Sequence, residues 1–137
     1  MIMYLPLILS LLAFDQTTKG NQHYQDEQYE EALESYREAA EDDPPAPEIH
    51  YNIGNTLYRQ EKYNQAAEAY RQAIVGETPL DAQAYYNLGN SLYRTGQLQP
   101  AAESYKRALK IKPDDLDAKY NLEFVQRQLE DQQQQQQ

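Results

Sequence analysis

Residues 85–113 read YYNLGNSLYRTGQLQPAAESYKRALKIKP and contain two helical patterns joined by a short turn. The first pattern covers residues 85–94 and the second covers residues 99–111, with Thr-Gly-Gln between them. In each pattern the apolar residues recur at the three- and four-residue spacing of an amphipathic helix. The stretch therefore predicts a helix, a tight turn and a second helix.

The same pattern occurs three times in the chain. A near copy, HYNIGNTLYRQEKYNQAAEAYRQAIVGETP, starts at residue 50, and a weaker copy, KGNQHYQDEQYEEALESYREAAEDDP, starts at residue 19. The copies follow one another at a period of about 34 residues. The aligned small and aromatic residues are Ala32, Ala66 and Ala101, then Tyr36, Tyr70 and Tyr105, then Ala39, Ala73 and Ala108. This self-similarity predicts an array of stacked two-helix units.

In this register and period the chain resembles the tetratricopeptide repeat family from about residue 15 to residue 131. The resemblance implies an all-α, right-handed superhelical α-solenoid of helix-turn-helix repeats. It divides the chain into repeats at 15–46, 47–79 and 80–113, followed by a capping helix at 114–131.

Glycine and proline recur at positions where helices are expected to approach closely or to end. Gly54 and Gly89 lie inside first helices, where a glycine costs about 1 kcal/mol relative to alanine. We therefore expect two helices to approach closely at these glycines. The extra residue between the second and third copies lies near Gly76 and predicts a longer loop. Prolines are expected to end each second helix, because proline lacks a backbone donor and clashes with the preceding turn. They are Pro44, Pro79 and Pro113.

The composition excludes several classes of function. The chain has 137 residues and a formal net charge of −10, so nonspecific nucleic-acid binding is not expected. It has no cysteine, which excludes disulfides, thiol catalysis, thiolate metal sites and a lipid-modified N-terminal cysteine. Most of the 13 tyrosines fall on the repeat register, which predicts roles in packing or in a groove.

Residues 1–14, MIMYLPLILSLLAF, contain no charged side chain. They are too few for a membrane-spanning helix, which needs about 20 apolar residues. Their length and the small residue Ala13 fit the apolar region of a signal peptide, although no lysine or arginine precedes them. We interpret them as a signal peptide or an N-terminal membrane anchor. The alternatives are a hydrophobic first helix that caps the solenoid and an incorrect start site.

The first repeat has a degenerate first helix. Lys19 and His23 stand where the second copy has Ile53 and Leu57. The second helix of this repeat is regular over residues 29–41. A stiff acidic connector is then expected over residues 41–47, which contain three prolines.

The C-terminal end predicts a helix without a partner helix. Asp114 and Asp115 are expected to cap a helix over residues 116–130. Residues 132–137 are all glutamine, a low-complexity tract that has no means of burial. We interpret the tract as a disordered tail, with a fraying extension of the helix as the alternative.

Each first helix carries a second face, nearly opposite its packing face. In the second repeat the packing face holds His50, Ile53, Gly54 and Leu57 by 3.6-residue geometry. The resemblance implies that the opposite face lines a concave groove. The candidate partner-binding residues on that face are Asn21, Tyr24, Tyr51, Asn52, Asn55, Tyr58, Arg59, Tyr86, Asn87, Asn90, Tyr93, Arg94, Tyr120, Asn121 and Phe124.

This set of side chains suits an extended peptide. An asparagine amide is both a donor and an acceptor, so it can bond a peptide backbone whatever the peptide sequence. Tyrosine adds rigid apolar area, and Arg59 or Arg94 can hold a carboxylate with two hydrogen bonds. We predict a non-enzymatic scaffold or adaptor that binds a partner protein. The alternatives are a purely structural consensus and a homo-oligomer formed through the terminal helices.

Catalytic and metal sites have no candidates in the sequence. His23 and His50 are far apart and fall on packing positions, so no metal site is predicted. The serines at the repeat positions, Ser35, Ser91 and Ser104, have no positioned histidine base. We therefore predict no catalytic residue, no metal and no cofactor.

The ends of the chain carry a narrower resemblance. The segment KYNLEFV at 119–125, the glutamine tract and the apolar N-terminus resemble the small tetratricopeptide proteins of bacterial Bat (aerotolerance) operons. This resemblance implies a membrane-associated scaffold that faces the periplasm and works beside von Willebrand A-type partners. The alternative location is the cytoplasm.

Overall fold

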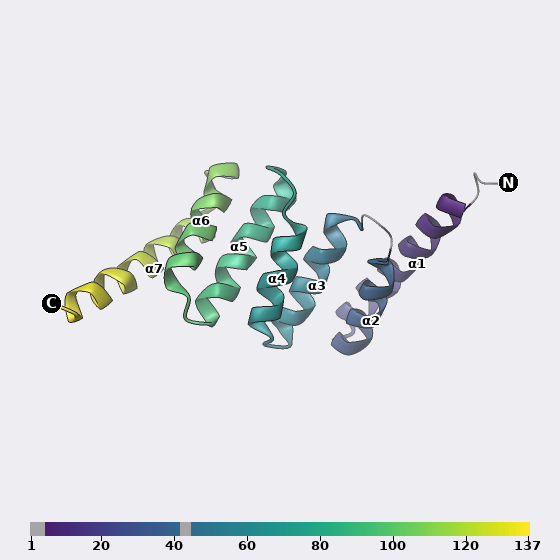
Figure 1. Ribbon diagram of the computed structural model, residues 1–137, viewed down its shortest axis with the longest axis horizontal. Helices are drawn as coiled ribbons and strands as arrows, with labels where there is room; N and C mark the ends of the chain where they lie inside the picture. Colours follow the sequence, from purple (N-terminus) through teal and green to yellow (C-terminus); the bar gives the residue numbers. More distant parts are fainter. Residues whose placement is uncertain (1–4, 42–44) are drawn as a thin grey trace.

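The computed structural model describes residues 5–41 and 45–137, which form seven α-helices and no strand. The helices follow one another along the molecule, with α1 and α7 at its opposite ends (Figure 1). Each helix packs against the next one in the chain. The helices are α1 Leu5–Gln25, α2 Tyr29–Ala39, α3 Pro47–Arg59, α4 Tyr63–Ala73, α5 Pro79–Arg94, α6 Leu98–Ile111 and α7 Leu116–Gln135. The predicted all-α solenoid of paired helices is confirmed.

A tyrosine packed against a glycine joins the two helices of each repeat. A Cβ atom on Gly54 would lie 2.7 Å from the ring of Tyr70, so no side chain fits at this position. The equivalent pairs are Gly20 with Tyr36 and Gly89 with Tyr105. All nine aligned alanines and tyrosines are at most 2% exposed. The close helix approach predicted from the glycines is confirmed.

The turn inside each repeat places one residue in the left-handed backbone region. The φ angle is 58° at Glu27, 61° at Glu61 and 77° at Gly96. These residues occupy the same register in the three repeats. Glycine adopts this conformation without cost, whereas a glutamate there is strained. The turn is therefore repeated in shape, although only the third repeat has the residue best suited to it.

A buried carboxylate organises the loop between α4 and α5. Asp81 is fully buried and accepts hydrogen bonds from the backbone N–H of Val75 (2.7 Å), Gly76 (3.3 Å) and Thr78 (2.7 Å). The hydroxyl of Thr78 donates a fourth bond, at 2.6 Å. Burial works to raise the pKa of Asp81, but these hydrogen bonds outweigh it and hold the pKa below its ordinary value. The extra residue near Gly76 lies in a loop, as predicted, and Asp81 fixes the path of that loop. The loop covers residues 74–78 and is not longer than the connection between α2 and α3, which covers residues 40–46.

Pro79 begins a helix, so the prediction that it ends one is wrong. Helix α4 already ends at Ala73, and Pro79 is the first residue of α5, where its missing N–H costs nothing. Thr78 and Asp81 form a capping box at the same helix end. Pro113 follows the end of α6, as predicted, and Pro44 lies outside the described residues.

The N-terminal apolar segment continues directly into the first helix of the first repeat. Helix α1 runs without interruption from Leu5 to Gln25, and residues 1–4 lie outside the described part of the chain. Leu12 and Phe14 are 56% and 71% exposed. In the described residues, no helix has the length and apolar character needed to cross a membrane.

The first helix of the first repeat forms despite its unusual residues. Lys19 is exposed and its ammonium lies 2.7 Å from the carboxylate of Asp15, one turn earlier. Gly20 packs on Tyr36, as the corresponding glycines do in the other repeats. Lys19 is therefore on the outside of an intact helix pair, whereas His23 is half-buried.

Helix α7 repeats the pattern of a first helix but lacks the means to bind a second one. Glu123 stands in the register of Gly54 and Gly89, so a tyrosine cannot pack there. The helix extends through Gln135 and includes most of the glutamine tract. The disordered tail is therefore not observed up to Gln135, because α7 continues through these residues. The structure therefore agrees with the alternative prediction, in which the tract extends the helix.

Candidate functional site

Asparagines of neighbouring repeats are hydrogen-bonded to one another along the first helices. The Oδ1 atom of Asn55 accepts from the hydroxyl of Tyr70 (2.8 Å) and from Nδ2 of Asn87 in the next repeat (3.3 Å). The same arrangement joins Asn21 with Tyr36 and Asn52, and Asn90 with Tyr105 and Asn121. We call these six asparagines and three tyrosines the asparagine ladder.

The ladder changes the interpretation of the asparagines. The sequence predicted amides free to bond a peptide backbone, but the Oδ1 atoms of Asn21, Asn55 and Asn90 each accept two bonds within the protein. These amides therefore hold one repeat to the next. Sequence reasoning missed this role because the partner of each asparagine lies on another helix.

Burial keeps the ladder hydroxyls protonated. It raises the pKa of Tyr36 to about 12, and it raises the pKa values of Tyr70 and Tyr105 further. A protonated hydroxyl donates a hydrogen bond to the asparagine oxygen, whereas a phenolate would only accept. The ladder is therefore unchanged by pH through the physiological range.

Tyr51 and Tyr86 extend this network. Nδ2 of Asn87 also donates to the hydroxyl of Tyr51 at 3.0 Å, and Nδ2 of Asn121 donates to that of Tyr86 at 3.3 Å. The ring of Tyr51 lies 5.8 Å from that of Tyr70. These two tyrosines therefore support the middle of the inner face.

The two predicted arginines have different surroundings. The guanidinium of Arg59 lies 3.7 Å from the carboxylate of Glu27 and 5.5 Å from the ring centre of Tyr29. Arg94 stacks 4.4 Å above the ring of Tyr63 and has no ion-pair partner among the described residues. Arg94 is therefore the arginine with an unneutralised charge.

A polar cavity of about 160 Å³ lies at the N-terminal end of the inner face. Asparagine and glutamine amides supply most of its polar groups, and two tyrosines complete it. Burial raises the pKa of Tyr24, so this hydroxyl is also neutral. The lining residues are Asn21, Tyr24, Gln25, Tyr36, Asn52 and Asn55. We call this space the N-terminal cavity.

An aromatic cavity of about 290 Å³ lies at the other end, between α3, α5, α6 and α7. Tyr93 and Phe124 meet edge to face with ring centres 5.9 Å apart. Tyr120 is 64% exposed and Phe124 is 39% exposed. The lining residues are Tyr58, Asn90, Tyr93, Arg94, Tyr105, Tyr120, Asn121, Phe124 and Val125. We call this space the C-terminal cavity.

Eleven of the fifteen predicted residues line one of the two cavities. The other four, Tyr51, Arg59, Tyr86 and Asn87, line neither of these two cavities. Gln25, Tyr36, Tyr105 and Val125 line the cavities without having been predicted. Tyr36 and Tyr105 were recognised from the sequence only as packing residues, although their hydroxyls reach the inner face.

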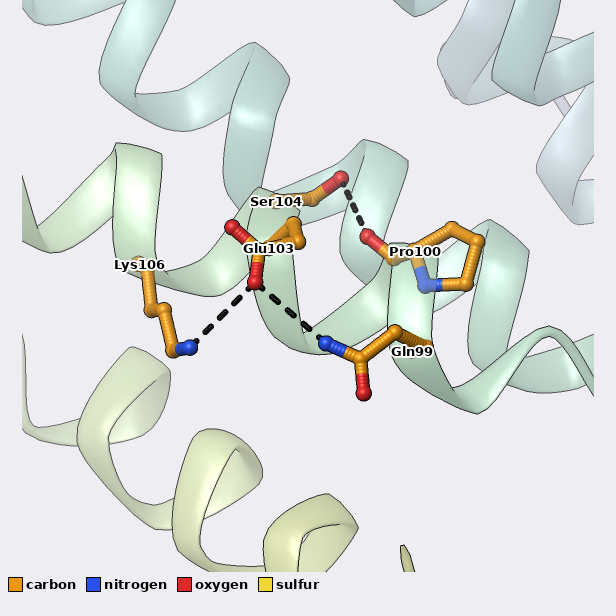
Figure 2. Close-up of polar contacts among 5 residues, drawn as sticks. All are labelled: Gln99, Pro100, Glu103, Ser104 and Lys106. Atoms are coloured by element: carbon orange, nitrogen blue, oxygen red, sulfur yellow. Dashed lines mark hydrogen bonds and ion pairs between the residues drawn. The ribbon is translucent and has the colours of Figure 1, made fainter.

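The outer surface of α6 differs from the inner face. The carboxylate of Glu103 accepts a hydrogen bond from Gln99 and pairs with Lys106, both at 3.3 Å (Figure 2). The hydroxyl of Ser104 donates to the carbonyl of Pro100 at 3.0 Å. Ser104 is buried, whereas Gln99, Glu103 and Lys106 are exposed and are paired along their own helix, so these three form a useful reference surface for binding experiments.

The described residues offer no cluster of three or more histidine, cysteine, aspartate or glutamate side chains able to hold a metal ion. Nδ1 of His23 lies 2.7 Å from the side-chain oxygen of Gln28. Partial burial lowers the pKa of His50. Both histidines are engaged in the helix packing that the sequence predicted for them.

Comparisons with known proteins agree with the repeat pattern. A family model described as tetratricopeptide repeat matches residues 51–115, and one described as TPR repeat matches residues 20–61. The two matches overlap and together run from residue 20 to residue 115. A search of curated protein sequences gives no match.

Solved structures with this fold are numerous. The first TPR of Spaghetti (RPAP3), bound to the HSP90 peptide SRMEEVD, is 24% identical with a TM-score of 0.79, covering 88% of this chain and 94% of that one. The second TPR domain of human RPAP3, in complex with the HSP70 peptide SGPTIEEVD, is 22% identical with a TM-score of 0.75, covering 88% and 98%. The N-terminal domain of STI-1 from C. elegans is 19% identical with a TM-score of 0.78, covering 86% and 97%. At these identities the similarity concerns the fold.

Proposed function

The chain belongs to the tetratricopeptide repeat family, and we propose that it is a non-enzymatic scaffold that binds an extended segment of a partner protein along its inner face. The observation that carries this proposal is the C-terminal cavity, where Tyr120 and Phe124 leave aromatic surface exposed to solvent. Exposed aromatic surface around a hollow is typical of a site that binds another molecule. Two of the similar structures hold peptides of HSP90 and HSP70, which supports the same use here.

A selection experiment tests the proposal without knowledge of the partner. The full chain would be used to select binders from a random library of displayed peptides, and each binder would be added to ¹⁵N-labelled protein. We expect chemical-shift changes at the inner face, for example at Asn52, Asn87 and Tyr120, and none at the outer residues Glu103 and Lys106. Failure to enrich any peptide, or shifts confined to the outer surface of α6, would refute the proposal.

We also propose that the scaffold works in a membrane-associated or periplasmic complex, with von Willebrand A-type partners. This part rests on the apolar residues 1–14 and on the resemblance of the chain ends described above. Fractionation of cells that produce the full chain or residues 15–137 tests it. The full chain is expected with the membranes or the periplasm, and the shortened chain in the cytosol. Equal distribution of the two would refute this location.

Self-association through the ends is a second candidate function. Leu116 and Tyr120 are 75% and 64% exposed on α7, and Leu12 and Phe14 are exposed on α1. These residues offer apolar surface to another copy at either end of the molecule. Sedimentation at increasing concentration separates the two functions, because self-association predicts a rising mass while a peptide-binding monomer keeps its mass.

A further inference from the structure

At Phe124 an aromatic residue takes the position of a repeated asparagine of the ladder. Counting from the aligned asparagines Asn52, Asn87 and Asn121, the residue three positions later is Asn55, Asn90 and then Phe124. Asn55 and Asn90 each accept bonds from a second helix and from the next repeat. At Phe124 the chain has an aromatic ring instead.

Phe124 makes the end of the inner face apolar. Its ring, with those of Tyr93, Tyr58 and Tyr120, surrounds the C-terminal cavity. The volume of about 290 Å³ is at the lower end of the range for small-ligand pockets, about 300–1,000 Å³. A cavity of this size and character suits one large apolar side chain rather than a whole folded element.

Arg94 supplies a positive charge at the edge of the same cavity. Stacking on Tyr63 holds its guanidinium in place, and the described residues give it no ion-pair partner. A guanidinium with free donors binds a carboxylate through two parallel hydrogen bonds. The ligand for this cavity therefore combines an apolar side chain with a nearby carboxylate.

The bound segment can continue beyond Arg94. This arginine also lines a second, more open cavity of about 530 Å³, which Gly96, Leu98 and the face of α7 containing Gln128 and Gln132 complete. Because cavities lie on both sides of Arg94, a bound segment can extend past this arginine in both directions. This favours an internal segment of the partner over its C-terminal residue. Asp131 lines this second cavity and the protein carries a net charge of −10, so a segment with several acidic residues is repelled.

We propose that the C-terminal cavity binds an internal segment of a partner protein that has a large apolar side chain and one aspartate or glutamate within two residues of it. The apolar side chain enters the cavity beside the paired rings of Phe124 and Tyr93, and the carboxylate pairs with Arg94. This inference rests on the proposed function and names the class of partner for the same inner face.

Matched synthetic peptides test the chemistry. The probe is an acetylated and amidated peptide with Phe-Glu at the centre of a Gly-Ser host, titrated into the ¹⁵N-labelled full chain. We expect binding to weaken about tenfold when the glutamate becomes glutamine and by at least that factor when the phenylalanine becomes alanine. A version that ends at the phenylalanine with a free carboxylate, and without the glutamate, is expected to bind more weakly than the probe.

Protein variants test the residues. Phe124→Asn and Arg94→Gln are each expected to weaken binding of the probe about tenfold. The control is Arg71→Gln, which changes an arginine of α4 that pairs with Glu68 and lines neither of the cavities beside Arg94, and it is expected to leave binding unchanged. If Phe124→Asn does not fold, Tyr120→Ser replaces it, because this side chain is more exposed.

Three results would overturn the inference directly, and a fourth, with library peptides, would separate it from the proposed function. The first is the absence of any shift at the C-terminal cavity with the Phe-Glu probe, and the second is equal binding of the glutamine or free-carboxylate peptides. The third is a dimer of the full chain that Phe124→Asn dissociates, because the occupant would then be a second copy. If library peptides bind the inner face but are indifferent to Phe124→Asn and Arg94→Gln, the proposed function stands and this inference fails.

Discussion

The middle of the inner face and its C-terminal end use the same helix positions for different purposes. Asn55 and Asn90 accept hydrogen bonds from within the protein and join the repeats, and Asn90 also lines the C-terminal cavity. At the end, Phe124 occupies the same register and borders a cavity. The comparison teaches that a residue repeated in every unit is required by the stacking of the units. Binding capacity is then expected where the repetition stops.

Among these predictions, truncating a tyrosine of the asparagine ladder is expected to lower the free energy of unfolding the most. Tyr70→Ala removes a ring that is 1% exposed and packs on Gly54. Loss of a buried aromatic side chain costs about 3–5 kcal/mol of unfolding free energy. The measurement is urea denaturation, with Tyr120→Ala at the exposed end as the matched control, for which we expect about 0.5 kcal/mol or less. Similar losses for both variants would remove the distinction between the two regions.

Asp81 sharpens the comparison, because it fixes the loop before its helix, whereas Asp115 at the same register accepts a bond from Ala118 within its own helix. Asp81→Asn removes a carboxylate that accepts four hydrogen bonds and is expected to cost about 2–3 kcal/mol at neutral pH. The folded pKa lies below the ordinary value of 3.8, so the stabilisation is fully present above 3.8 and is lost as the pH falls through the folded pKa. Thermal melting between neutral and strongly acidic pH measures both effects.

Asp81→Asn is expected to change the pH dependence of thermal melting in a specific way. Wild-type protein is expected to lose more stability than Asp81→Asn as the pH falls below 3.8, so the two curves converge. Parallel curves would show that Asp81 is not the titrating group. Such a result would also leave the loop near Gly76 without an electrostatic explanation.

Removing one ladder asparagine has an intermediate expected effect. Asn90→Ala leaves the buried hydroxyl of Tyr105 and the amide of Asn121 without their acceptor, at a cost of about 1–2 kcal/mol. The control is Asn64→Ala, an exposed asparagine on α4, for which the change is expected within about 0.5 kcal/mol. Equal stability of the two variants would mean that the ladder is incidental to repeat stacking.

Most of the fold follows from the sequence because each unit carries its own packing residues. Gly54 and Gly89 predicted the close approach of helices, and the aligned alanines predicted the core. Pro79 was misread because proline stops one helix and starts the next equally well, and only the capping box of Thr78 and Asp81 distinguishes the two cases. For the glutamine tract the sequence left a disordered tail and a helix extension open, because composition alone does not show that α7 continues through it.

The candidate site was less predictable than the fold. Helical geometry predicts which residues share one face, but it does not show which polar groups are already bonded. The Oδ1 atoms of Asn55 and Asn90 already accept hydrogen bonds from Tyr70 and Tyr105 and from the next repeat or α7. These donors are distant in sequence. The difference between Arg59 and Arg94 likewise depends on Glu27, from a neighbouring repeat.

The smallest expected effect concerns the turns, where the shape repeats but the residue does not. Glu61 has a φ of 61°, and Glu61→Gly relieves a left-handed strain that costs about 1 kcal/mol. Glycine also has more freedom to lose on folding, so the net gain is expected to be about 0.5 kcal/mol. Urea denaturation measures it, with Gly96→Ala in the third repeat expected to change stability in the opposite direction. If Glu61→Gly destabilises the protein, the glutamate makes a contribution that outweighs its strain. Glu61 would then stabilise its turn in a way that Gly96 does not in the third repeat.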